Sequence, residues 1–193
     1  MNAPASVWLI RHGETEWSRS GAHTGRTDLP LTKSGEERAS ATGRYLAGRR
    51  FALVLTSPLQ RAIDTCRIAG YGDVAQVEPN LREWDYGEYE GRTTADIRRE
   101  APNWSLWTMG VPGGETIEEV AHRARLVLES VSSISGDVAL FAHGHILRIL
   151  TACWLDLSPD AGRLFAFDTG CLSVLGYERE IRVIQRWNLS PEV

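Results

Sequence analysis

Cysteine is scarce in this sequence, and the placement of the few cysteines argues against two kinds of structure. The chain has 193 residues and three cysteines, Cys66, Cys153 and Cys171. They are odd in number, widely spaced and form no C-x-x-C pair, which argues against a disulfide framework and against a cysteine-based zinc site. We expect these thiols to be reduced and mostly buried.

Long apolar runs are lacking as well. The first residues, MNAPASVWLIRHG, have no basic region and only a short apolar run, so they do not resemble a secretory signal. No apolar stretch approaches the roughly 20 residues that a membrane-spanning helix needs. We expect a cytoplasmic protein that does not associate with membranes.

An excess of positive charge is also absent. The formal net charge is -4, and acidic and basic residues are mixed along the chain. A protein that binds nucleic acid by neutralising phosphates is usually basic, so we expect no nucleic-acid partner. The length suits a single domain over residues 1–193. The sequence leaves open whether the protein forms a homodimer.

What the sequence does contain is an alternation of buried strand patterns with amphipathic helix patterns. The last two predicted strands lie close enough in sequence to form a hairpin at a sheet edge. Strands are expected at residues 7–10, 51–57, 74–77, 138–142, 171–178 and 181–188. This alternation predicts an α/β fold with a mostly parallel sheet. Residues from about 81 to 114 are rich in Gly, Trp and charge, and we interpret them as a small cap over a site.

Basic side chains follow three of the predicted strands. Arg11 and His12 end the first strand, Arg61 lies one turn into the helix after the second, and His143 and His145 follow the fourth. In open α/β sheets the site lies outside the carboxyl ends of the strands, so these groups are expected to converge. Arginines and helix N-termini bind phosphate, and a neutral histidine can attack phosphorus. The pattern indicates phosphoryl transfer at a site that needs no metal.

A proton donor for the leaving oxygen is the missing part of that site. A carboxylic acid can supply the proton if burial raises its pKa. The cap stretch LREWDYGEYEG offers Glu83, Asp85, Glu88 and Glu90. Spacing alone does not choose among them.

Five motifs that follow one another along the chain indicate a known family. They are RHGET, TSPLQRAIDT, LREWDYGEYEG, GGET and FAHGH. Together they resemble the histidine phosphatase superfamily in its phosphoglycerate mutase-like branch. The resemblance implies a three-layer α/β/α fold and no metal or other cofactor. The cap motif and the W-x-x-W stretch are similar to a subgroup that includes fungal sedoheptulose-1,7-bisphosphatase and bacterial acid phosphatases of broad specificity.

The resemblance also assigns roles to particular residues. It implies that His12 is the phosphorylated nucleophile and that Glu83 donates the proton. It implies that Arg11, Arg61 and His143 complete the phosphate pocket. The expected substrate-binding set is Arg11, Gly13, Ser18, Thr24, Arg61, His143 and Gly144. Ser18 stands where many relatives have an asparagine at the pocket edge. The roles of Glu14, His23, Trp84 and His145 stay open.

Three functions are compatible with these residues. The leading one is a phosphatase for small phosphomonoesters, with sugar phosphates or bisphosphates as the expected substrates. The second is a phosphoglycerate mutase, although mutase relatives carry a longer Lys- and Arg-rich insertion after the acid-bearing motif. The third is a catalytically inactive phosphate-binding module. A second phosphate could be received by Arg92, Arg98 and Arg99, whose orientation the sequence does not give.

Overall fold

The computed structural model describes residues 6–192 and is built around one six-stranded sheet. The strands are β1 (Val7–Arg11), β2 (Leu53–Thr56), β3 (Ala75–Val77), β4 (Val138–Ala142), β5 (Leu172–Glu178) and β6 (Ile181–Leu189). The α-helices are α1 (Glu16–Ser20), α2 (Lys33–Leu46), α3 (Gln60–Ile68), α4 (Thr94–Glu100), α5 (Leu106–Met109), α6 (Ile117–Ser132) and α7 (Gly144–Trp154). Short 3₁₀ turns are η1 (Gly72–Val74), η2 (Pro79–Leu81), η3 (Gly87–Tyr89) and η4 (Pro159–Leu164).

The sheet has the predicted mixed character. Its strand order is β3-β2-β4-β1-β5-β6. The pairs among β3, β2, β4 and β1 are parallel, and β5 and β6 add an antiparallel hairpin at one edge. The central strands β1 and β4 are neighbours, with Arg11 paired to Ala142 at their carboxyl ends. The residues that follow these two strands therefore emerge side by side.

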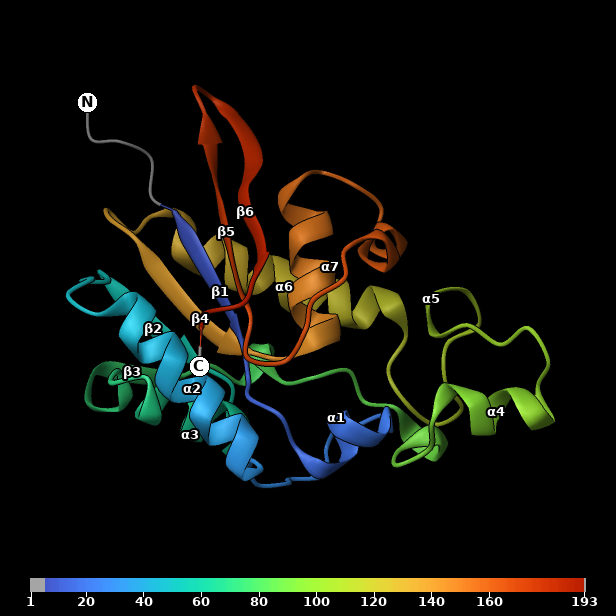
Figure 1. Cartoon of the computed structure of the whole chain (residues 1–193). Coiled ribbons are helices and arrows are strands. Elements are labelled where there is room, and N and C mark those ends of the chain that lie inside the picture. Colours follow the sequence, from blue (N-terminus) through green and yellow to red (C-terminus); the bar gives the residue numbers. More distant parts are fainter. Residues whose placement is uncertain (1–5, 193) are drawn as a thin grey trace.

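Helices cover both faces of the sheet, which confirms the three-layer α/β/α expectation (Figure 1). The alternation along β1 shows why. Val7 and Leu9 pack in the same core as α6 and α7, whereas Trp8 and Ile10 face the core that contains Leu46 of α2 and part of α3. A strand buried on both sides has no polar face, and this explains its continuous apolar sequence. The three cysteines are free and buried, as predicted.

The cap segment (residues 81–114) leaves the sheet after β3 and returns at α6. Figure 1 shows its helices α4 and α5 standing to one side of the sheet. Tryptophans stabilise it from within: Trp84 and Trp104 are buried, and their indole N–H groups donate to the carbonyls of Glu115 and Gly110 at 2.8 and 2.9 Å. Trp104 thus packs the cap from within. None of the helices in residues 6–192 has the length and apolar character to cross a bilayer.

Candidate active site

A cavity of about 160 Å³ opens at the carboxyl ends of the central strands, where the sequence predicted the site. The segments that line it are the end of β1, the loop around α1, the start of the cap segment and the start of α7. The lining residues are Arg11, His12, Ser18, Gly21, Ala22, His23, Thr24, Glu83, Tyr86 and His145. Five of them come from the predicted set of catalytic and substrate-binding residues, and the others come from the loop after α1, the cap segment and α7.

His12 has the geometry and charge state of a nitrogen nucleophile. Its Nδ1 lies 2.7 Å from the carbonyl oxygen of Gly13. Because that carbonyl can only accept, Nδ1 carries the proton and Nε2 keeps its lone pair. Burial, followed by the charges of Arg61 and Arg11, holds the pKa of His12 well below its ordinary value. The imidazole is therefore neutral.

Arg11 presents an unused donor beside His12. Its guanidinium is anchored by a hydrogen bond from Nη1 to the carbonyl of Phe167. Its buried Nε has no hydrogen-bond partner among residues 6–192. A buried unsatisfied donor is costly, and Arg11 also lines the cavity, where its cationic guanidinium would attract an anion. A Cβ on Gly144 would lie 3.1 Å from Cζ of Arg11, so a larger residue here would press on the guanidinium.

Arg61 and His143 lie beneath the cavity instead of lining it. Both are fully buried. Arg61 donates from Nε to Nδ1 of His143 at 3.0 Å, and its other nitrogens bind the carbonyls of Thr24, Gly25 and Thr27. Since Nδ1 of His143 accepts, its Nε2 carries the proton and donates to Oγ of Ser57 at 2.7 Å. The two residues predicted to hold phosphate thus fix the loop around Thr24 and support His12, whose ring centroid is 5.1 Å from that of His143.

Glu83 is held by the start of α7. Its Oε2 accepts from the backbone N–H of His145, and its Oε1 accepts from the backbone N–H groups of Ile146 and Trp84, all within 3.0 Å. Burial raises the pKa of this carboxyl, but the hydrogen bond and charge of His145, with the charge of His143, outweigh it and hold the pKa well below its ordinary value. The carboxylate is ionised in the empty cavity.

This arrangement corrects one expectation about helix N-termini. The sequence suggested that the starts of two helices would offer free amides to phosphate. At α7 those amides bind Glu83, and at α3 the amide of Gln60 binds Oδ1 of Asp28 at 2.8 Å. A side-chain carboxylate satisfies the helix end in both places, by the same dipole attraction that would otherwise favour a bound anion.

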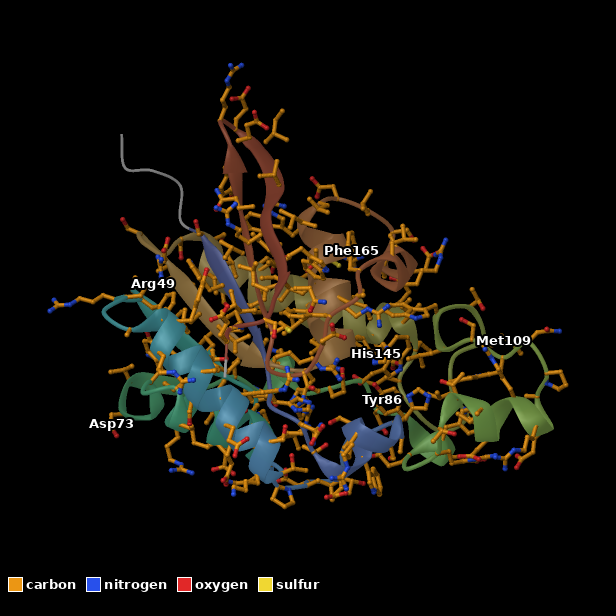
Figure 2. All side chains as sticks on the ribbon, in the orientation of Figure 1. Arg49, Asp73, Tyr86, Met109, His145 and Phe165 are labelled. Carbon is orange, nitrogen blue, oxygen red and sulfur yellow. The ribbon has the colours of Figure 1, made fainter. Side chains whose placement is uncertain are left out.

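A group of rings forms the side of the cavity that faces the cap. Figure 2 shows Tyr86 and His145 next to each other between the sheet and the cap segment. Oη of Tyr86 lies 2.7 Å from Nδ1 of His145, and the ring of His23 lies 4.8 Å from that of Tyr86. Burial, with the charge of His145, lowers the pKa of His23 to about 4. This side of the cavity is therefore polar but uncharged.

The sequence did not single out Tyr86 or Ser57. Tyr86 lies three residues after Glu83 in the same motif, and that proximity was its only signal. Ser57 ends the second strand and binds His143, a contact between residues 86 positions apart. Its position at a strand end could have suggested a role.

The remaining predicted residues divide between the cavity and the framework. Ser18 and Thr24 line the cavity. Gly13, which was expected to bind substrate, does not line the cavity. A Cβ there would lie 2.3 Å from the carbonyl oxygen of Gly35, so this glycine permits close contact with α2. Glu14 accepts a hydrogen bond from Thr32 at 2.8 Å, and Trp84 lies in the core.

The three cap arginines that the sequence offered for a second phosphate have partners within the cap segment. Arg92 pairs with Glu100 at 2.6 Å and Arg99 pairs with Asp96 at 2.8 Å. Arg98 donates to the carbonyl of Trp104 at 2.9 Å. These three arginines do not line the cavity.

Comparison with known proteins agrees with this geometry. The family model of the histidine phosphatase superfamily (branch 1) matches residues 7–190. The chain belongs to this superfamily. It is 41% identical over 180 residues to an acid phosphatase of Mycobacterium tuberculosis, covering 90% of this chain and 87% of that protein. It is 34% identical over 182 residues to sedoheptulose 1,7-bisphosphatase of Saccharomyces cerevisiae, covering 77% of this chain and 67% of that protein.

The fold comparison is equally close. The solved structure of an open reading frame from Mycobacterium tuberculosis matches with a TM-score of 0.92 and 37% identity, covering 97% of this chain and 99% of that one. Family membership and the phosphatase relatives confirm the expectation of a phosphoric monoester hydrolase whose family acts on small phosphate esters.

Proposed function

We propose that this member of the family hydrolyses small phosphomonoesters, foremost sugar phosphates, through a phosphohistidine on His12 and without a metal. One observation carries the proposal: a neutral His12 with a free Nε2 lines one small cavity together with Arg11, whose buried Nε has no partner, and with Glu83. Phosphoryl transfer requires a nucleophile, a hydrogen-bond donor for the anionic phosphate oxygens and an acid–base group.

In the first step, Nε2 of His12 attacks phosphorus. An N–P bond forms, the P–O bond to the leaving group breaks, and the leaving oxygen takes the proton of Glu83. Arg11 stabilises the negative charge of the equatorial oxygens. Glu83 is ionised in the empty cavity, but the negative charge of a bound phosphate raises its pKa and loads it with a proton.

In the second step, water replaces the phosphate on His12. The carboxylate of Glu83 removes the proton of the attacking water, an O–P bond forms and the N–P bond breaks. Inorganic phosphate leaves and His12 is again neutral, while Glu83 releases the proton that it took from water to the solvent and is ionised as before. The second role of Glu83 uses the ionised form that its three backbone donors favour.

The cavity favours a leaving group that is uncharged and carries hydroxyls. Its far side is made of His23, Tyr86 and His145, which can exchange hydrogen bonds with hydroxyl groups. Within residues 6–192 the cavity is lined by a single arginine, Arg11, and by no lysine. We therefore expect monophosphates to be better substrates than bisphosphates of the same sugar.

The first experiment is phosphate release by the purified protein in excess EDTA. The panel contains an aryl phosphate, sugar mono- and bisphosphates, 3-phosphoglycerate and a phosphotyrosine peptide. Turnover under chelation, fastest with a sugar monophosphate, is the expected result. Turnover that requires an added metal would contradict the metal-free route.

The same panel separates the alternatives. If no member of the panel releases phosphate, but 3-phosphoglycerate is isomerised after priming with bisphosphoglycerate, the protein is a mutase. Silence in both assays with retained phosphate binding would establish an inactive binding module. Faster hydrolysis of the bisphosphate than of the matched monophosphate would overturn the inferred substrate preference.

A further inference from the structure

His145 occupies a position that the proposed reaction does not yet use. Its Nδ1 lies 2.7 Å from Oη of Tyr86 and 3.8 Å from Oε2 of Glu83. The imidazole thus stands between a hydroxyl group and the proposed proton donor, at the surface of the cavity. Figure 2 shows the two residues close together.

The backbone and the side chain of His145 act on Glu83 separately. The backbone N–H donates to Oε2 at 3.0 Å because His145 lies in the first turn of α7. The side chain reaches the same oxygen from the cavity side. A substitution of His145 therefore removes the imidazole and leaves the backbone donors of the carboxylate in place.

Few other ionisable groups face this imidazole. They come from β1, from the loop after α1, from the segment after η2 and from α7 itself: Arg11, His23, Glu83, Tyr86 and Arg148. The rings of Trp84 and Trp107 enclose it, with centroids 6.3 and 5.3 Å away. Burial lowers the pKa of His145, against the hydrogen bond and charge of Glu83. Among these groups Glu83 provides the negative charge that favours the imidazolium.

We propose that His145 is a positioning residue for the proton donor: the imidazole, held at Nδ1 by the hydroxyl of Tyr86, governs how readily Glu83 takes up its proton. This inference rests on the proposed role of Glu83 as general acid. It assigns to the imidazole an action through Glu83, with no contact to the reacting phosphorus.

The direction of the effect follows from charge. When the imidazole is protonated, a positive charge 3.8 Å from Oε2 stabilises the carboxylate and opposes protonation of Glu83. The hydroxyl of Tyr86 has the reverse influence. The hydroxyl can donate a hydrogen bond to Nδ1 of the neutral imidazole. When the imidazole is protonated, the hydroxyl can accept a hydrogen bond from Nδ1–H, which is then not available to Glu83. His145 and Tyr86 therefore affect the acid in opposite directions.

The decisive measurement is the pH profile of kcat/KM for two substrates. A sugar phosphate has a poor leaving group and needs the acid, whereas an aryl phosphate does not. The second ionisation of the phosphate gives both substrates an alkaline limb, so the part of the limb that only the sugar phosphate shows reports the loss of the proton from Glu83. Since kcat/KM covers only the steps up to phosphorylation of His12, the later hydrolysis of the intermediate does not obscure it.

For His145→Gln we expect the alkaline limb for the sugar phosphate to move to higher pH. The profile for the aryl phosphate should keep its shape. The control is His122→Gln, which changes an exposed histidine on α6 and should leave both profiles unchanged. An equal loss for both substrates with an unshifted limb would mean that His145 is merely structural, and would overturn the proposal.

Tyr86→Phe supplies the second arm. It removes the hydroxyl at Nδ1, so the limb for the sugar phosphate should move to lower pH, opposite to His145→Gln. A shift of both variants in the same direction would contradict the proposed linkage. Thermal unfolding of each variant confirms that a folded protein was assayed.

Failure of the underlying function gives a different result. If Glu83 is not the acid, Glu83→Gln slows the sugar and aryl phosphates equally, and the wild-type profiles of the two substrates have the same alkaline limb. That outcome removes both proposals. A selective effect of Glu83→Gln combined with no shift in His145→Gln removes only the role of His145.

Discussion

The active-site cavity has two sides that are built differently. The floor consists of Arg11, His12, Arg61 and His143, and the wall consists of His23, Glu83, Tyr86 and His145. The floor residues bind main-chain carbonyls or one another, and Arg61 and His143 are fully buried. In the wall, rings from the loop after α1, the cap segment and α7 meet at centroid distances of 4.8 to 6.4 Å.

The floor and the wall are positioned by different contacts, and this suggests different tasks for them. Parallel pairing of β1 with β4 fixes the floor, because the register that pairs Arg11 with Ala142 also brings His12 and His143 together. The position of the wall depends on how the cap segment packs. We infer that the floor supplies what every phosphate ester needs, whereas the wall distinguishes leaving groups and controls the proton.

The largest effect is expected from the floor. His12→Ala removes the proposed nucleophile, and turnover should fall by about 10⁴-fold or more for every substrate, since covalent catalysis has no substitute here. Phosphate release over long incubations measures the residual rate. His122→Ala, on the exposed face of α6, is the matched control and should retain full activity. Substantial turnover by folded His12→Ala would disprove the phosphohistidine route.

The proposed proton donor in the wall should give a large but selective effect. For Glu83→Gln we expect kcat/KM for sugar phosphates to fall by about 10²- to 10⁴-fold, the usual contribution of general acid catalysis. Aryl phosphates should lose much less, because their leaving groups depart without a proton. Steady-state rates with the two substrates test this contrast. Equal losses would remove Glu83 from the acid role and erase the distinction between floor and wall.

The floor was also the part that sequence could predict. Strand patterns and the residues that follow them identified Arg11, His12, Arg61 and His143, because a buried strand and its carboxyl end are local features. The structure adds that Arg61 and His143 act from below the cavity.

The sequence named His23, Glu83 and His145 of the wall, but it did not predict Tyr86 or how the wall is assembled. The contact between Tyr86 and His145 joins residues 59 positions apart, and it depends on the path of the cap segment. The occupation of both helix N-termini by Asp28 and Glu83 also required three-dimensional contacts. Composition suggested that the cap arginines could receive a second phosphate, but their own carboxylate and carbonyl partners lie within the cap.

A smaller effect, on stability, should follow when a hydrogen bond beneath the cavity is removed and the reacting atoms are left unchanged. Ser57→Ala removes the acceptor for Nε2 of the buried His143. An unsatisfied buried donor costs about 1–3 kcal/mol, so the free energy of unfolding should fall by that amount. Chemical denaturation measures it. Ser132→Ala on the exposed end of α6 is the control and should change stability by less than about 0.5 kcal/mol. An unchanged stability in Ser57→Ala would show that the floor does not need this bond.

The smallest effect concerns His23, and it tests whether packing in the wall keeps this imidazole uncharged. Folding lowers the pKa of His23 from 6.5 to about 4, chiefly through burial. Between these values the unfolded chain binds a proton that the folded chain does not, so His23 reduces stability as the pH falls from about 6.5 to about 4 and has no such effect above that range. In His23→Phe the loss of Tm over this range should be smaller than in the wild type. The same Tm profile in both proteins would mean that His23 ionises freely, and that the wall can carry charge.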